Sequence, residues 1–525
     1  MNEKRTRGNS ALIGIALMLL LPIAACDDNS DNNSGSLKPQ ADNPVVEGPI
    51  TGGGGDDCCK LVVVPGELEV DFRDRGYTPG TPFYAGLTFD EAELGYRETE
   101  YFISGTAKSY LPTDELTEDG IWKVQAADAA DYVSRIVVLR PENDADFNGS
   151  VVVEWFNVTG GVDASPDLVY THTELMREGY AWVGVSAQFV GVEGGGSFEM
   201  PLKLADPERY SGLSHPGDSF AYDIFSQAAQ AVRYPVGIDP LEGLKVERMI
   251  GIGQSQSAGR LTTYINAIHP TIELFDGFVI HSRGDAAAPL SQAPQVEASV
   301  PHPTLTRNDL AEPIIGLQAE GDLFLLGSVV ARQPDSAFYR LWETAGTAHS
   351  DAYTTIKGRF DRGDDPTVAD VIATVDASPP LLKCNSPIND GPTHWIARAA
   401  IAAIDRWIRT GEAAPEAQRL SLNEDQTGFV RDEFGNATGG IRTPYVDAPV
   451  ATLTGEKQTG TSYCFLFGTT ELFDDARLAM LYPTKQAYID AIDEATDAAV
   501  TAGFLVPVDA DLIKARARTS GLGGP

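Results

Sequence analysis

The spacing of hydrophobic positions divides this chain into regions with different expected structure. Between residues 61 and 145, short runs of β-branched and aromatic residues are separated by Pro and Gly, which predicts leading strands, mostly antiparallel. From Ser150 onward, strand-like and helix-like segments alternate, a pattern typical of a mostly parallel sheet with helices on both faces. Strands of this sheet are expected at 151–156, 180–186, 246–252, 278–280, 314–317 and 340–345.

Apolar residues at helical spacing predict the helices between these strands. Asp218 and Thr484 are candidate N-caps, and glycines are the expected left-handed C-caps. The helices are expected at 166–178 before Gly179, from about 218 to 232, from about 257 to Pro270, from Trp395 to Gly411, and from Thr484 to Gly503.

The first 26 residues have the pattern of an export signal. Basic residues precede an apolar run at 11–23, which is short for a membrane span and suitable for a secretory signal. The run ends in Ile-Ala-Ala-Cys26, which resembles a bacterial lipoprotein signal and implies lipidation of Cys26. We therefore expect an exported protein, lipid-anchored to a bacterial membrane and facing the periplasm. Asp27 resembles an inner-membrane retention signal, but inner versus outer membrane stays open.

These patterns suggest the following organisation. Residues 27–60 are polar and glycine-rich, which predicts a flexible tether after the signal at 1–26. An N-terminal β extension at 61–145 precedes a catalytic core at 146–415, with insertions at 283–312 and 350–392. The first insertion lacks clear periodicity and could cover the site as a cap. A C-terminal, helical extension at 416–525 is expected to pack on the core.

The charge of the chain excludes one class of partner. Lys plus Arg number 39 and Asp plus Glu number 75, which gives a formal net charge of −36. Such a surface repels phosphate backbones, so nucleic-acid binding is not expected. The oligomeric state stays open.

Four cysteines remain once Cys26 is assigned to lipid, an even number in an oxidising compartment. We favour a disulfide between Cys384 and Cys464, which would fasten the C-terminal region. Cys58 and Cys59 could form a vicinal bridge or stay reduced. Because the cysteines lack metal-ligand spacing to histidine, we expect no metal, and no organic cofactor is needed.

The strand-to-helix turn at 253–257 has the pattern of a nucleophile elbow. Gly253 and Ser257 flank Ser255, and small residues at these positions let strand and helix approach closely around a strained serine. Ser257 is the alternative, flanked by Ser255 and Gly259. Its position inside the first helical turn makes it the weaker candidate.

The expected partners of this serine follow later strands. Asp322 follows strand 314–317 and is the predicted acid, with Glu320 as the alternative. His349 follows strand 340–345 and is the predicted general base, since imidazole titrates near neutrality. The order serine, aspartate, histidine is that of the alpha/beta-hydrolase fold. His215 and His281 are the weaker candidates for the general base. Structural roles are expected for His172, His269 and His302.

An oxyanion hole would combine the N–H of Gln256, which follows the serine, with one from the loop after an earlier strand. That loop is Asn157-Val158-Thr159-Gly160-Gly161. The sequence leaves open whether Asn157, Val158 or Thr159 supplies the second donor.

Several stretches resemble the bacterial family known as the alpha/beta hydrolase domain family. The resemblance covers nearly all of the mature chain and implies Ser255 as nucleophile and His349 as base, but it does not separate Asp322 from Glu320. Some members are one residue shorter between Ser255 and Arg260. The matching stretches are EWFNVTGG from Glu154, GVSAQFVGV from Gly184, GQSQSAGR from Gly253, WETAGTAHSD from Trp342, GGIRTPYVDAP from Gly439 and LFGTTELF from Leu466.

The sequence therefore predicts a serine hydrolase that cleaves a small-molecule carboxylic ester through an acyl-enzyme on Ser255. An amidase, peptidase or acyltransferase could use the same residues, because ester and amide substrates pass through the same kind of tetrahedral intermediate. A non-catalytic binding protein on the same fold is the alternative from another class.

Overall fold

The computed structural model describes residues 63–68, 82–196, 200–375 and 383–523. The predicted signal at 1–26 with Cys26, the tether at 27–60, and Cys58 and Cys59 lie outside the described residues. Within the described ranges, no helix is both long and apolar enough to cross a membrane.

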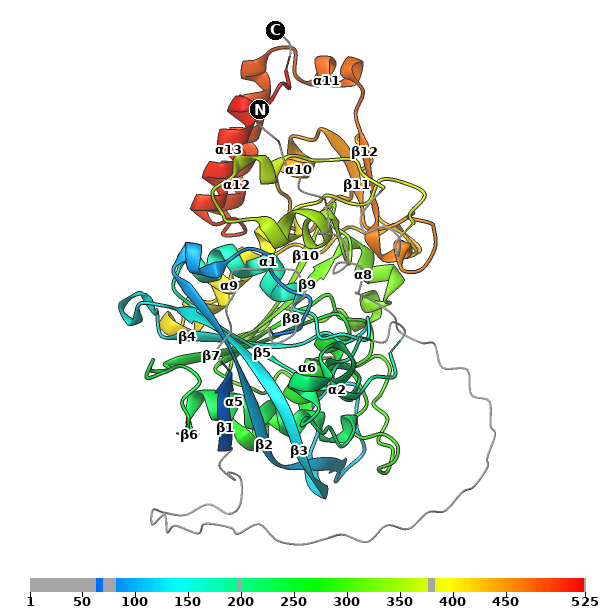
Figure 1. Cartoon of the computed structure of the whole chain (residues 1–525). Coiled ribbons are helices and arrows are strands. Elements are labelled where there is room, and N and C mark those ends of the chain that lie inside the picture. The colour runs from blue at the N-terminus through cyan, green and yellow to red at the C-terminus, as the bar shows by residue number, and fades with distance from the viewer. Residues whose placement is uncertain (1–62, 69–81, 197–199, 376–382, 524–525) are drawn as a thin grey trace, which may run out of the picture.

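A sheet of ten strands, counted over the described residues, runs through the centre of the molecule (Figure 1). Its strand order is β10-β9-β8-β7-β4-β5-β3-β2-β1-β6, and β11 and β12 form a separate antiparallel pair. The strands are β1 (Val63–Leu68), β2 (Tyr96–Pro112), β3 (Val124–Pro141), β4 (Ser150–Trp155), β5 (Ala181–Val185), β6 (Val236–Gly237), β7 (Arg248–Gln254), β8 (Gly277–His281), β9 (Ile314–Ala319), β10 (Tyr339–Thr344), β11 (Ala451–Thr454) and β12 (Thr469–Leu472).

Strand direction divides the sheet into two parts. One part is parallel and consists, in spatial order, of β5, β4, β7, β8, β9 and β10. In the other part, β3 is antiparallel to β5. The long strands β2 and β3 form an antiparallel pair that extends the sheet. This confirms the predicted mostly parallel sheet with leading antiparallel strands.

Helices cover both faces of the sheet, and side chains of successive strand residues enter the two cores in alternation. On β7, Met249 lies in the apolar cluster with α5 and α6, and Ile250 lies in the cluster with α1 and α9. The α-helices are α1 (Pro166–Arg177), α2 (Phe189–Glu193), α3 (Leu202–Ala205), α4 (Pro207–Tyr210), α5 (Ala221–Arg233), α6 (Gln256–Thr263), α7 (His269–Ile272), α8 (Glu320–Leu325), α9 (Thr393–Thr410), α10 (Pro444–Asp447), α11 (Asp475–Leu481), α12 (Lys485–Thr501) and α13 (Pro507–Thr519).

The glycine caps were predicted correctly, but two helix ends were not. Gly179, Gly411 and Gly503 have positive φ at or just past the ends of α1, α9 and α12. Pro270, expected to stop the helix after the elbow, lies inside α7. A π-helical turn, η4 (Tyr264–Ile268), precedes it and absorbs the irregularity that a residue without an N–H introduces. Asp218 does not cap α5; its carboxylate accepts from Phe189 N–H and Arg260.

The first insertion, at 283–312, lies alongside the helical segment that comes after the elbow. Ala288 N–H donates to Gly259 O at 3.0 Å, and Asn266 Nδ2 donates to Leu305 O at 2.8 Å. These bonds fasten the insertion along α6 and η4.

The C-terminal extension is not purely helical, because it also contains the β11–β12 pair. Figure 1 shows α12 and α13 stacked at one end of the molecule, beyond the face of the sheet that α1 and α9 cover. Tyr488 on α12 and Ile513 on α13 are buried in the same apolar cluster as Trp395 on α9. The extension therefore shares a core with the sheet domain.

Candidate active site

Ser255 lies at a strained turn between β7 and α6. Its φ is 63° and its ψ is −120°, a conformation that residues with a side chain rarely adopt. Its N–H donates to His281 O on the neighbouring strand at 2.9 Å. A Cβ at Gly253 would lie 3.1 Å from the backbone of Ser257, so glycine allows the close approach of strand and helix. The strand runs two residues further than predicted and brings Ser255 to its very end.

Ser255, His349 and Asp322 form one hydrogen-bonded chain. His349 Nε2 lies 2.9 Å from Ser255 Oγ, and His349 Nδ1 lies 2.6 Å from Asp322 Oδ1. The Asp322 carboxylate can only accept when ionised, so Nδ1 carries the proton and Nε2 is free to accept from the serine. Asp322 is 0% exposed and Ser255 is 7% exposed, so the serine end of the chain is the one that faces outward.

The two candidate acids have different partners. Asp322 lies in the first turn of α8, where a simple turn was expected, and its Oδ2 accepts from Ala319 N–H at 2.6 Å. Glu320 points away from His349: its Oε1 accepts from Arg431 and its Oε2 from Gly346 N–H. Burial raises the pKa of Glu320, although the Arg431 charge opposes this. The structure brings Asp322, and not Glu320, to the histidine.

The side chains of the alternative serine and histidines bind partners other than Ser255, His349 and Asp322. Ser257 is buried and its hydroxyl donates to Phe156 O at 3.1 Å, which fastens α6 to the loop after β4. His281 Nδ1 lies 2.7 Å from Asp167 Oδ1, and His215 Nε2 lies 2.9 Å from Ala187 O. His172 is buried against main-chain carbonyls, His269 lies near Glu312 and His302 near Asp285.

Of the three candidate amides in the loop after β4, two have acceptors within the described residues. Asn157 N–H donates to Ala164 O, and Asn157 Oδ1 accepts from Thr159 N–H at 2.9 Å. Asn157 Nδ2 donates to Gln254 O at 3.0 Å, which joins this loop to the residue before Ser255. Among the described residues, the N–H groups of Val158 and Gln256 have no acceptor. Of the three candidates in this loop, Val158 is therefore the one whose amide is available to a ligand.

A buried ion-pair network supports this loop, and sequence reasoning missed it. Arg135 on β3 donates to Asp163 at 2.8 Å and to Glu100 at 2.6 Å, and all three side chains are fully buried. Asp163 also accepts from Ser186. An arginine within the apolar run SRIVVLR was the available signal, because a buried charge requires a partner.

Another buried carboxylate, Glu154, joins the strand beside the elbow to neighbouring elements. It accepts from the N–H groups of Asp167 and Leu168 at the start of α1 and from Trp182 Nε1. Burial and the nearby Asp167 charge hold the pKa of Glu154 well above its usual value. These hydrogen bonds explain why the predicted strand, which is otherwise apolar, contains one polar residue, Glu154.

Cys384 and Cys464 form a disulfide across a sequence separation of 80 residues. Within the described ranges, no three His, Cys, Asp or Glu side chains are grouped as a metal site would require.

A serine at positive φ between a strand and a helix, joined to residues from later strands of a mostly parallel sheet, defines the class of this protein as an α/β hydrolase. The sequence profile described as alpha/beta hydrolase domain matches residues 46–515, and the chain belongs to that family. A search of curated proteins finds no significant match.

Solved structures that resemble the chain share only low sequence identity with it. A structure named as a dienelactone hydrolase from Klebsiella pneumoniae is 16% identical, over 46% of this chain and 85% of that one, with a TM-score of 0.25. A glucuronoyl esterase from Teredinibacter turnerae is 11% identical over 47% and 73%, with a TM-score of 0.24. A structure named as an acetyl xylan esterase from Bacteroides fragilis is 14% identical over 51% and 70%, with a TM-score of 0.24.

Proposed function

We propose that this α/β hydrolase cleaves a carboxylic ester, with Ser255 as nucleophile, His349 as general base and Asp322 as its orienting acid. The observation that carries the proposal is the continuous hydrogen-bonded chain from Ser255 Oγ through His349 to Asp322, at 2.9 and 2.6 Å. A structural serine would not require a strained backbone at the end of a sheet strand.

In this mechanism Ser255 Oγ attacks the ester carbonyl carbon while His349 Nε2 takes the hydroxyl proton. The Asp322 carboxylate stabilises the imidazolium. The N–H groups of Val158 and Gln256 donate to the oxyanion, and return of the proton to the alkoxide releases the alcohol. Water then attacks the acyl-enzyme with His349 again as base, which frees the acid and restores Ser255.

The proposed place of action is the periplasmic side of a bacterial membrane, with the chain anchored by lipid on Cys26. Two features support this. The signal-like segment ends at Cys26. Cys384 and Cys464 form a disulfide, and disulfides persist in oxidising compartments such as the periplasm. Cys26→Ser should move the protein from the membrane fraction to the soluble fraction, and unchanged fractionation would contradict the anchor.

A matched substrate screen tests the reaction. The full chain, purified in detergent, should hydrolyse p-nitrophenyl esters of some acyl chain length faster than the corresponding anilides. Ser255→Ala should abolish this activity, while Ser257→Ala, which removes only the bond to Phe156 O, should retain much of it. Faster cleavage of anilides would identify an amidase, and no turnover of either series would favour a binding protein on this fold.

A further inference from the structure

The turn from β9 into α8, which carries Asp322, and the loop after β10, which carries His349, are called here the two loops. They contact each other and also a segment of the C-terminal extension, residues 454–468, which we call the clamp. The two loops follow different strands, β9 and β10. Their relative position sets the geometry of the His349–Asp322 hydrogen bond. An element that contacts both loops can therefore fix that geometry.

Glycine backbones meet where the clamp reaches the two loops. A Cβ at Gly455 would lie 2.2 Å from Gly321 N, beside Asp322, and 2.4 Å from Thr347 O in the histidine loop. A Cβ at Gly468 would lie 2.9 Å from the Cβ of Ala348, next to His349. Real side chains do not approach so closely, so the clamp is packed directly onto the main chain of both loops.

Hydrogen bonds join the clamp to the same loops. Ser350 N–H, just after His349, donates to Leu466 O at 3.2 Å. Thr454 Oγ1 donates to Glu320 Oε1 at 2.9 Å, while Glu320 Oε2 accepts from Gly346 N–H at 3.1 Å. The carboxylate that does not bind the histidine thus links the start of α8 to the clamp and to the histidine loop.

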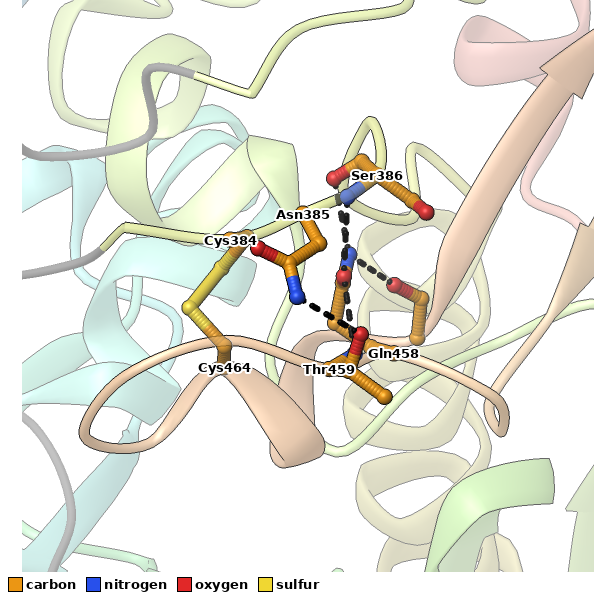
Figure 2. The surroundings of a disulfide bond; sticks show 7 residues. Cys384, Asn385, Ser386, Gln458, Thr459 and Cys464 are labelled. Atoms are coloured by element: carbon orange, nitrogen blue, oxygen red, sulfur yellow. Dashed lines mark hydrogen bonds between the residues drawn. A yellow bond between two sulfur atoms is a disulfide. The ribbon is translucent and has the colours of Figure 1, made fainter.

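The disulfide holds the other end of the clamp, as Figure 2 shows. Beside it, Asn385 Nδ2 donates to Thr459 Oγ1 at 3.0 Å and Gln458 Nε2 donates to Ser386 O at 2.9 Å (Figure 2). The segment that follows leads to the buried Asn389, whose N–H donates to Phe467 O and whose Nδ2 donates to Gly346 O at 3.0 Å. The bond between Cys384 and Cys464 therefore joins two segments that both reach the histidine loop.

We propose that the clamp is a positioning element for the acid–base pair, with Gly455 as its contact to both loops and the disulfide as its fastening. This inference rests on the proposed function. The clamp contacts the loops of Asp322 and His349, and within the described residues it forms no hydrogen bond to Ser255 or to the loop at 157–161. Displacing it should impair the chemical step and leave substrate binding largely unchanged.

The test compares two glycine substitutions in the full chain. Neither glycine has positive φ, so the comparison is steric: Gly455→Ala forces the clamp away from both loops, whereas a Cβ at Gly428 meets only Asn423 Nδ2, at 3.4 Å. We expect Gly455→Ala to lower kcat by about 10- to 100-fold, since small misplacements of catalytic groups cost this much, with little change in KM. Gly428→Ala should match the wild type.

A spectroscopic signal provides a readout independent of turnover. The proton on His349 Nδ1, shared with Asp322, should give a far-downfield proton NMR resonance that His349→Ala removes. Gly455→Ala should shift or broaden this resonance, and Gly428→Ala should not. A folded Gly455→Ala protein with an unchanged resonance and unchanged kcat would overturn the proposal.

The double variant Cys384→Ser, Cys464→Ser removes the disulfide without a steric clash. It tests the positioning role of the clamp if Gly455→Ala fails to fold. We expect a several-fold loss in kcat and a broadened resonance; the wild-type values for both would overturn the proposal. If the wild type neither hydrolyses esters nor reacts with a serine-directed probe, the proposed function fails. The resonance comparison would still test the positioning role.

Discussion

At the scale of single residues, Asp322 and Glu320 are two positions apart, but only one of them reaches the histidine. Asp322→Asn should lower kcat by about 10⁴-fold, because His349 loses the carboxylate that fixes its tautomer. Glu320→Gln should lower kcat far less, since its carboxylate binds Arg431 and Gly346 N–H instead. Steady-state kinetics on folded variants measures both effects. Reversed magnitudes would make Glu320 the acid.

Asp351, two residues after the base, gives a prediction for stability against pH. Burial raises its pKa from 3.8 to about 6, with the Asp390 charge acting in the same direction and the bond from Thr354 N–H opposing it. A raised carboxyl pKa means that the folded state favours the protonated form, so this contribution to stability is lost as pH rises from about 4 to about 6.

Asp351→Asn cannot ionise and should escape this loss. The free energy of unfolding of the variant, relative to wild type, should rise by about 2 kcal/mol between those two pH values. Denaturant titrations over a pH series measure it, with the exposed Asp364→Asn as control. A difference that stays flat with pH would contradict the assignment.

At the scale of elements, the loop after β4 depends on Asn157. Its side chain accepts from Thr159 N–H and donates to Gln254 O, and so joins the loop that contains the Val158 amide to the residue before Ser255. Asn157→Ala should reduce kcat by about 10-fold or more, somewhat less than removing an oxyanion donor outright, with KM little affected. Asn143→Ala, in an exposed turn, is the control. An unchanged kcat would exclude this loop from the oxyanion hole.

The elements that could be predicted from sequence are those with a local signal. The strands around the elbow, the αL glycines and the position of Ser255 follow from apolar periodicity and small-residue spacing. The continuation of the helix through Pro270 depends on a π-turn, and the choice among three amides at 157–159 depends on which acceptors the fold supplies. The apolar run around Arg135 signals a buried charge, but its partner Asp163 lies on a distant segment, so no local pattern identifies the pair.

At the scale of the whole molecule, α13 places a charge in the core of the sheet domain. Asp509 is fully buried, and its Oδ1 lies 3.3 Å from Arg177 on α1 and 3.4 Å from Arg398 on α9. Arg398 is also fully buried and contacts Asp361 at 2.8 Å. The C-terminal extension thus helps to neutralise a cation that the sheet domain buries, a dependence that the sequence did not reveal.

Asp509→Ala should therefore lower the free energy of unfolding by about 3 kcal/mol, because it leaves buried positive charge with fewer partners. Asp511→Ala, an exposed position on the same helix, should have little effect. Denaturation curves of the two variants make the comparison. Equal stabilities would show that Arg398 and Arg177 do not need Asp509.

The central claim is that Ser255 is the nucleophile, and labelling by a fluorophosphonate tests it most directly. The probe should add once per chain, and mass spectrometry of the digested protein should find the adduct on Ser255. Asp322→Asn should slow the labelling, and Ser255→Ala should abolish it. An adduct on Ser257 or on any other residue, or a wild-type chain that does not react, would contradict the account.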